Sequence, residues 1–131
     1  METNPTTRPS NRAGDLESIP VLRSARLREI ERLAGLSAVE GVLTLFTNSV
    51  GRWIETATEA LVANDLWRVA RAAHSIGSGA AAVGAERLRL HALNLELAAT
   101  MANSSQCERL LEHVRLDTAA TLSELGRVRE G

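Results

Sequence analysis

The stretch DLWRVARAAHSIGSGAAAVGA, residues 65–85, has the apolar spacing of an amphipathic helix. The pair Asn64–Asp65 offers a turn and an N-cap in front of this helix, and Gly84 is expected to end or kink it. Apolar residues recur every three or four positions along one face, namely Leu66, Val69, Ala73, Ile76, Ala80 and Val83. His74 lies about 130° from the centre of that stripe, because each helical residue turns the chain by ~100°. The imidazole is therefore predicted to point away from the core.

Two more segments with helical periodicity precede this stretch. The first is short and ends at Gly35, and its apolar stripe consists of Leu27, Ile30, Leu33 and Ala34. The second is long, and Ser37 and Glu40 are expected to start it as a capping box. Its stripe consists of Leu43, Phe46, Val50, Trp53, Ile54, Ala57 and Leu61.

Two further helices are expected after Gly84. The first begins near Glu86, with a core face of Leu88, Ala92, Leu95 and Ala99 that is broadened by Leu90, Leu93, Leu97 and Met101. Ser105 and Glu108 form a second expected capping box. The stripe of the last helix consists of Cys107, Leu111, Val114, Thr118, Thr121 and Leu125. Short loops between long helices favour antiparallel neighbours. The predicted fold is all-α, an antiparallel up-down-up-down four-helix bundle with a short additional N-terminal helix.

The composition agrees with an all-α domain and argues against several classes of function. The 131 residues include no Tyr, one Phe and two Trp, which leaves few of the residues that favour strands. A net charge of -1 argues against nucleic acid as a partner. The single cysteine excludes an internal disulfide and a cysteine-based metal cluster. No apolar run approaches the ~20 residues of a membrane span, so we expect a cytoplasmic domain without membrane contact.

The first twenty residues differ in composition from the rest of the chain. They carry all three prolines together with Thr, Ser, Asn and Arg, a mixture that buries little apolar surface. We therefore predict a disordered leader or interdomain linker over residues 1–20 and the helical bundle domain over residues 21–131.

The residues that follow His74 are almost all small and uncharged, and three interpretations of this pattern are open. Close packing of another helix would account for Ala80 and Gly84. It would not account for Gly77, Ser78 and Ala81 beside the imidazole. His74 could also be an incidental surface histidine. The third interpretation is a nucleophilic imidazole presented to another protein, because neutral imidazole has a free nitrogen lone pair near pH 7 and forms phosphoramidates.

The stretch HSIGSGAAAVGA resembles the phosphorylation motif of histidine-containing phosphotransfer (HPt) domains, the bundle-shaped relays of bacterial multi-step phosphorelays. The matching positions are His74, Ile76, Gly77, Ser78, Gly79, Ala80, Val83, Gly84 and Ala85. RVARAAH (68–74) is similar to the approach to the family's histidine. ERLRLHALNLE (86–96) resembles the "L…LE" signature of the next helix, which here ends at Leu95 and Glu96. The likeness covers roughly residues 20–126.

This resemblance implies a phosphorelay carrier without autonomous catalytic activity. His74 would accept a phosphoryl group, on Nε2, from the aspartate of one receiver domain and pass it to another. The chain itself would need no cofactor, because Mg²⁺ would belong to the receiver. The implied docking surface consists of Trp67, Ala70, Arg71, Gly77, Ser78 and Ala81. Trp67 is either the apolar anchor of that surface or a core residue at the end of the bundle.

Position 77 departs from the family's pattern, which usually has a lysine three residues after the histidine. Gly77 supplies no charge, and in mid-helix it costs up to about 1 kcal/mol relative to Ala. Our hypothesis is that Arg71, one turn before His74 on the same face, partly replaces the lysine. A second function stays open for the same reason: an HPt-like adaptor that binds a receiver or another regulator without efficient phosphotransfer.

The remaining candidate residues carry less chemistry. His91 and His113 are interpreted as partly buried or solvated histidines rather than ligands. No helix pairs two metal-ligating residues in the way that a bundle-core metal site requires, so no metal site is predicted. Cys107 lies on an apolar stripe and is interpreted as an inert core thiol.

Overall fold

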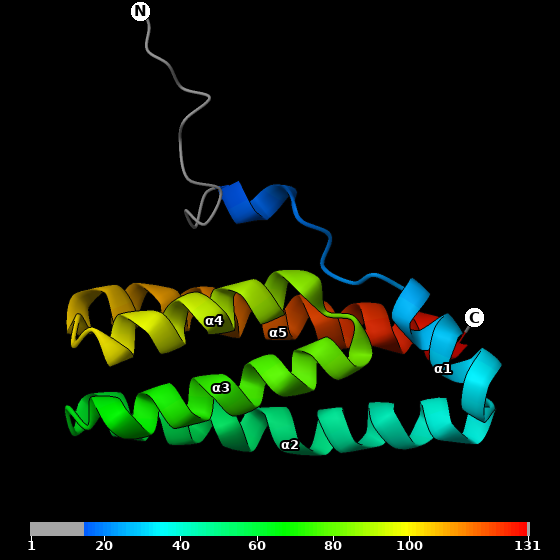
Figure 1. The fold of residues 1–131 in the computed structure, drawn as a ribbon, viewed down its shortest axis with the longest axis horizontal. Coiled ribbons are helices and arrows are strands. Elements are labelled where there is room, and N and C mark those ends of the chain that lie inside the picture. The colour runs from blue at the N-terminus through cyan, green and yellow to red at the C-terminus, as the bar shows by residue number, and fades with distance from the viewer. Residues whose placement is uncertain (1–14, 131) are drawn as a thin grey trace, which may run out of the picture.

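The fold is a helical bundle with one short helix in front, as seen in a computed structural model that describes residues 15–130 (Figure 1). A short 3-10 helix, η2 (Asp15–Ser18), comes first. It is followed by α1 (Ala25–Ala34), α2 (Leu36–Val62), α3 (Leu66–Val83), α4 (Glu86–Thr100) and α5 (Ser104–Glu130). Within this range the structure contains helices and no strands. The predicted all-α, up-down-up-down bundle is confirmed.

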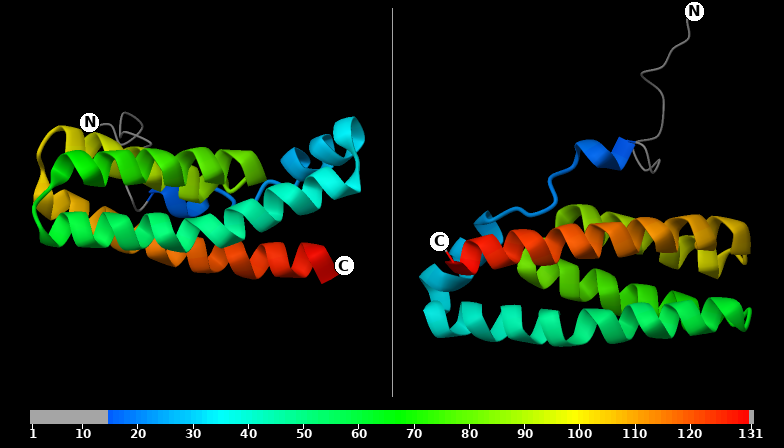
Figure 2. Two further views of the ribbon diagram at one scale, coloured as in Figure 1. Left: turned by 90° about the horizontal axis from the view of Figure 1, so that it is seen from below. Right: turned by 180° about the vertical axis from the view of Figure 1, so that it is seen from behind.

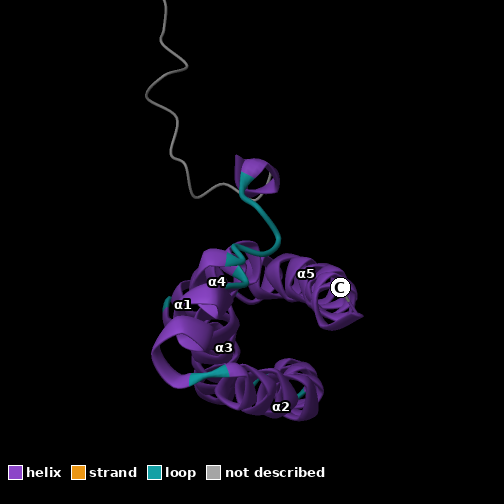
Figure 3. Ribbon diagram, turned by 90° about the vertical axis from the view of Figure 1, so that its right-hand side faces the viewer, coloured by secondary structure: helices purple, strands orange, loops and turns teal. Residues whose placement is uncertain are grey.

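Helix α3 packs against both of its sequence neighbours in the bundle. Viewed from the end, α3 lies between α2 and α4, while α5 packs on α4 (Figure 3). Two further views place α1 and the C-terminal end of α5 at the same end of the bundle (Figure 2). Because α3 is the central element of this arrangement, its rotation about its own axis decides which of its residues reach the surface.

The apolar stripes predicted for α3 and α5 form the core. In α3, Leu66 is half-buried, and the buried stripe residues are Val69, Ala73, Ile76, Ala80 and Val83. In α5 all six predicted positions are buried, namely Cys107, Leu111, Val114, Thr118, Thr121 and Leu125. Burying such side chains supplies most of the favourable free energy of folding.

Both predicted capping boxes are wrong, because each helix has its N-cap two residues before the predicted one. Helix α2 already begins at Leu36, so Ser37 lies inside its first turn and Gly35 stands at the N-cap. Helix α5 begins at Ser104, and the Asn103 side chain accepts a hydrogen bond of 3.1 Å from the backbone N–H of Gln106. The predicted N-cap of α3 is confirmed, because Asp65 accepts a hydrogen bond of 3.3 Å from the backbone N–H of Arg68.

The core face of α4 is narrower than the sequence predicted. Leu88, Ala92 and Leu95 are buried, as expected. Leu90 is only half-buried, whereas Leu93, Leu97 and Met101 are exposed. The reason is that α4 packs mainly against α3 and α5, which leaves its third face to solvent. Leu33 in α1 is likewise exposed, against expectation.

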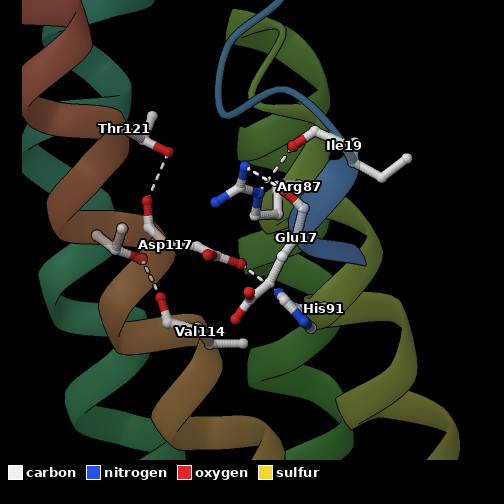
Figure 4. Close-up of polar contacts among 8 residues, drawn as sticks. Glu17, Ile19, Arg87, His91, Val114, Asp117 and Thr121 are labelled. Carbon is white, nitrogen blue, oxygen red and sulfur yellow. Dashed lines mark hydrogen bonds and ion pairs between the residues drawn. The ribbon is translucent and has the colours of Figure 1, made fainter. Parts of the chain in front are cut away.

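Residues 15–20, the end of the predicted leader, lie against α4. Arg87 holds them: Nε donates to the carbonyl of Ile19 (2.8 Å) and Nη2 to that of Glu17 (2.9 Å) (Figure 4). Its backbone N–H donates to the carbonyl of Pro20 (3.3 Å), and Leu16 is buried. This six-residue part of the predicted leader is therefore packed in the structure. Residues 1–14 lie outside the described residues, so the disorder expected there and the division at residue 20 stay predictions.

Two glycines allow α3 to approach its neighbours closely. A Cβ on Gly79 would lie 2.8 Å from Cζ3 of Trp53 and 3.4 Å from Cδ1 of Phe46, so α2 leaves no room for one. Gly84 ends α3 in a left-handed conformation with φ of +82°, and its carbonyl accepts a hydrogen bond of 2.8 Å from the Arg23 N–H. Close helix packing therefore explains Gly79, a motif position to which the sequence analysis gave no packing role.

The interior holds one histidine–carboxylate pair. Nδ1 of His91 on α4 donates to the Asp117 carboxylate on α5 (Figure 4), and their side chains are only 1% and 9% exposed. The His91 ring stacks on His113, with the ring centroids 4.8 Å apart. His91 is thus fully buried, whereas the sequence analysis predicted a partly buried or solvated histidine. Nε2 of His91 is buried without a hydrogen-bond partner. We therefore interpret the pair as a structural link between α4 and α5.

We expect Gly77→Ala and Gly79→Ala to change stability in opposite directions. Alanine gains about 1 kcal/mol of helix propensity at either position. At position 77 the new Cβ would meet only Cβ of Ala92 at 3.7 Å and the Arg89 carbonyl at 4.0 Å, which are ordinary contacts. At position 79 it must displace the Trp53 ring, so Gly79→Ala should lose about 1 kcal/mol net. Urea unfolding measures both variants, and equal shifts would contradict the described packing.

Asp117→Ala should lower the free energy of unfolding by about 2–4 kcal/mol, because it leaves the buried His91 without its partner. Glu124→Ala is the matched control, since it breaks the exposed pair of Glu124 with Arg127 (3.1 Å) on the same helix. That variant should stay within about 1 kcal/mol of the parent protein. Comparable losses in the two variants would show that the His91–Asp117 pair does not link α4 to α5.

Candidate functional site

His74 lies in the middle of α3, on the surface that faces away from α2. Its side chain is 70% exposed, which confirms the orientation predicted from the periodicity of the helix. The neighbouring positions Ala73 and Ile76 are buried and fix the rotation of α3. The packed helix thus fixes the backbone of His74, while the imidazole ring remains accessible to solvent.

The carboxylate of Glu96 on α4 faces one edge of the imidazole. Nδ1 of His74 lies 3.3 Å from Oε2 and 3.4 Å from Oε1, at the long end of the hydrogen-bonding range. An ionised carboxylate can only accept, so in this contact Nδ1 must carry the proton. The neutral ring then has its lone pair on Nε2, the nitrogen that does not face Glu96.

His74 and Glu96 lie between two open hollows on the surface formed by α3 and α4. The hollow toward the C-terminal end of α3 is lined by Ala73, His74, Gly77, Ser78, Ala81, Arg89, Leu93 and Glu96. The other hollow is lined by Trp67, Ala70, Arg71, His74, Ser75, Glu96 and Thr100. Small side chains line much of both hollows, so another protein can approach the imidazole from either side.

The structure brings all six predicted docking residues to these two hollows. Gly77, Ser78 and Ala81 line the first hollow, and Trp67, Ala70 and Arg71 line the second. Ser78 and Ala81 are exposed, whereas Gly77 and Ala70 are half-buried, and Gly77 faces Ala92 of α4.

Trp67 is a surface residue. Its side chain is 69% exposed, so the alternative of a core tryptophan at the end of the bundle was wrong. The guanidinium carbon of Arg71 lies 4.9 Å from the centre of the Trp67 ring, within the range of a cation–π interaction. Together the two side chains form a flat surface with an apolar and a cationic part.

Sequence reasoning missed the residues that α4 contributes. Glu96 was quoted only as part of a signature, and Arg89 and Leu93 were given no part in the site. All three line the hollow beside Gly77. The signal was present in principle, because Glu96 and Leu93 are three residues apart and therefore share one face of a helix. The sequence does not reveal which residue of α4 lies opposite His74.

The other candidate residues are not part of this surface. Burial raises the pKa of the Cys107 thiol, which is fully buried, in line with an inert core residue. Over residues 15–130 no three His, Cys, Asp or Glu side chains are grouped so that they could hold a metal ion. In the same part of the chain, no helix combines the length and apolar character that crossing a membrane requires.

Comparisons with known proteins agree with this geometry. No curated protein sequence matches the chain significantly. The fold is similar to the crystal structure of histidine-containing phosphotransfer protein B from Pseudomonas aeruginosa PAO1, with a TM-score of 0.80 and 20% sequence identity. That similarity covers 86% of this chain and 96% of the other. The family model of the Hpt domain matches residues 41–128, the region that contains α3, α4 and His74. The chain therefore belongs to the Hpt domain family, whose members carry phosphoryl groups in phosphorelays.

Proposed function

We propose that this chain is a phosphorelay carrier that accepts a phosphoryl group on Nε2 of His74 from the aspartate of one receiver domain and passes it to another. The observation that carries the proposal is the contact of Nδ1 of His74 with Glu96 on an otherwise exposed ring. Membership of the Hpt domain family supports the same role. The identity of His74 as the acceptor rests on its exposure and on its place in the motif.

Glu96 prepares the imidazole for this reaction in two ways. By accepting a hydrogen bond from the Nδ1–H group it favours the tautomer in which Nε2 has a free lone pair. It also supplies a negative charge beside the ring, and this charge stabilises the cationic ring that forms when Nε2 is phosphorylated. Glu96 is therefore a positioning residue, since it acts on the phosphoryl group through the imidazole.

The transfer step balances without a further reactant. The lone pair of Nε2 attacks phosphorus, a new N–P bond forms, and the P–O bond to the receiver's aspartate breaks. The aspartate leaves as a carboxylate with the electron pair of that bond. The imidazole keeps its Nδ1 proton and becomes a phosphorylated imidazolium next to Glu96. Transfer to the second receiver is the reverse of this step, with the aspartate of that receiver as the nucleophile.

The chain acts as a carrier in this account rather than as an enzyme. Phosphoryl transfer depends mainly on in-line positioning and on neutralisation of charge. The receiver would supply the aspartate and Mg²⁺, while this chain supplies the imidazole and a surface for docking. We propose that the docking surface consists of six of the residues that line the two hollows: Trp67, Ala70, Arg71, Gly77, Ser78 and Ala81.

His74→Gln should abolish labelling of the protein by a receiver domain that carries a radiolabelled aspartyl phosphate. In the wild-type protein the label should be acid-labile and base-stable, as expected of a phosphohistidine. His113→Gln is the control, because His113 stacks on the buried His91 and lies outside both hollows. Labelling that persists in His74→Gln would refute His74 as the acceptor. Absence of label in the wild-type protein despite measurable receiver binding would instead support an adaptor.

Glu96→Ala should slow phosphoryl transfer to His74, and Glu96→Gln should slow it less, because the Gln amide oxygen can still accept a hydrogen bond from Nδ1–H. A partly exposed ionic pair contributes up to about 1 kcal/mol, which corresponds to a loss of roughly fivefold in rate. Glu108→Ala, which removes an exposed carboxylate at the start of α5, serves as the control. Transfer at the wild-type rate in Glu96→Ala would contradict the role given to Glu96.

A further inference from the structure

We propose that an arginine-lined hollow between α1 and the end of α3 attracts acidic residues at the edge of the receiver domain, and so selects receivers that carry such residues. This inference rests on the proposed function and names a property of the partner. It concerns residues outside the two hollows that flank His74.

The third hollow lies where α1 packs beside the C-terminal end of α3 (Figure 1). Four arginines and two glutamates line it, namely Arg23, Arg26, Arg28, Arg32, Glu29 and Glu86. The two helices are close at this point, because a Cβ on Gly84 would lie only 3.0 Å from Cβ of Arg26. We call this feature the arginine hollow.

Both glutamates of the arginine hollow already have an arginine partner. Glu29 pairs with Arg26 (3.0 Å), one turn earlier on α1. Glu86 accepts hydrogen bonds of 3.0 and 2.7 Å from Arg89 on α4. Neither carboxylate is therefore free to neutralise the other arginines of the lining.

Two of those arginines have no carboxylate partner. Arg28 and Arg32 are exposed and lie one turn apart on α1. Nη1 of Arg28 donates to the hydroxyl of Ser24 (2.6 Å), which is a neutral group. In the described part of the chain neither arginine forms an ion pair. Two uncompensated positive charges thus stand at this hollow, on a chain whose net charge is -1.

The arginine hollow adjoins the surface around His74. Ala81 lines both this hollow and the hollow beside Gly77. It lies seven residues after His74, which places it on the same side of α3 and about 10 Å along the helix. A standard interface covers an area on each partner that corresponds to a disc with a radius of about 16 Å. A receiver centred on His74 therefore extends over Ala81 to the edge of the arginine hollow.

Charges at the edge of an interface act mainly on the rate of association. A positive patch attracts a negative patch on the partner before the two surfaces touch, and it repels a partner whose edge is basic. Arg28 and Arg32 would therefore favour receivers with acidic residues at the edge that faces α1. Their effect concerns which receiver reaches His74, and not the chemistry at Nε2.

The test measures the association rate constant of a fluorescently labelled receiver domain that binds the wild-type protein. Stopped-flow mixing at salt concentrations of about 10 mM and about 1 M compares Debye lengths of about 30 Å and about 3 Å. Arg28→Gln/Arg32→Gln removes two charges, and Arg28→Glu/Arg32→Glu reverses them. At low salt the rate constant should fall about threefold and about tenfold, respectively. At high salt both variants should associate at nearly the wild-type rate, because the charges are screened.

Arg52→Glu/Arg109→Glu is the matched control. Both arginines are exposed and line none of the three hollows, and the substitutions change the net charge by the same amount. The control should stay within about twofold of the wild-type rate constant at low salt. Phosphoramidate, which phosphorylates histidine without a receiver and releases ammonia, should label His74 at the wild-type rate in every variant.

Four results would overturn the proposal. The first is a wild-type rate constant at low salt in both Arg28/Arg32 variants. The second is an equal loss in the control, which would make the effect one of net charge. The third is a loss of the same size at high salt, which would make it steric. The fourth is slower labelling by phosphoramidate, which would place the effect at His74 or in the fold.

Failure of the proposed function is distinguishable from these results. The association rate constant is measured without phosphoryl transfer, so it reports on the arginine hollow even if the chain is an adaptor. In that case the receiver would bind with the predicted dependence on charge and salt, while its aspartyl phosphate would leave no label on His74.

Discussion

The contact between Gly79 of α3 and the aromatic rings of Trp53 and Phe46 on α2 sets the arrangement of the site. No Cβ fits between them, so α3 can approach α2 closely only with this position turned toward it. His74 lies five residues earlier and therefore about 140° away around the helix, while Gly77 lies about 60° from His74. With Gly79 facing α2 and Gly77 facing α4, the imidazole must emerge at the surface beside α4. The position of Glu96 next to Nδ1 follows from this rotation.

Residues 15–130 contain two histidine–carboxylate pairs, and burial separates their roles. His74 and His91 both direct Nδ1 toward a carboxylate on the following helix, Glu96 in one case and Asp117 in the other. Nε2 of His91 is buried without a partner, so no phosphate donor can approach it. The ring of His74 is largely exposed, and hollows on both sides allow access. The same local chemistry therefore serves structure in the interior and is available for reaction at the surface.

The sequence was sufficient for the helices and for the face of α3 on which His74 lies. Periodicity measures the angle of each residue around its own helix, so the buried positions of α3 and α5 and the exposure of His74 could be predicted. It overestimated the width of the core face of α4, because Leu93, Leu97 and Met101 are apolar yet exposed. The starts of α2 and α5 were misplaced by two residues, because α2 begins after Gly35 without a side-chain cap and Asn103, rather than Ser105, caps α5.

The residues that α4 brings to the site could not be predicted in the same way. Periodicity does not reveal the register between two helices, so Glu96 could not be assigned to His74 from the sequence, nor Arg89 and Leu93 to the hollow beside it. The packing role of Gly79 was overlooked for a related reason, since it depends on the position of a ring in another helix. In each case the missing information was the relative position of two helices, which no property of a single residue reveals.

The central claim is that Glu96 directs the chemistry of His74 to Nε2. Long-range ¹⁵N–¹H correlation spectra of the imidazoles, recorded on the ¹⁵N-labelled protein before and after phosphorylation, test it most directly. The account predicts a neutral His74 ring with its proton on Nδ1, and after phosphorylation a ring with phosphorus on Nε2 and the proton still on Nδ1. A ring protonated on Nε2 before the reaction, or phosphorus on Nδ1 after it, would contradict the account.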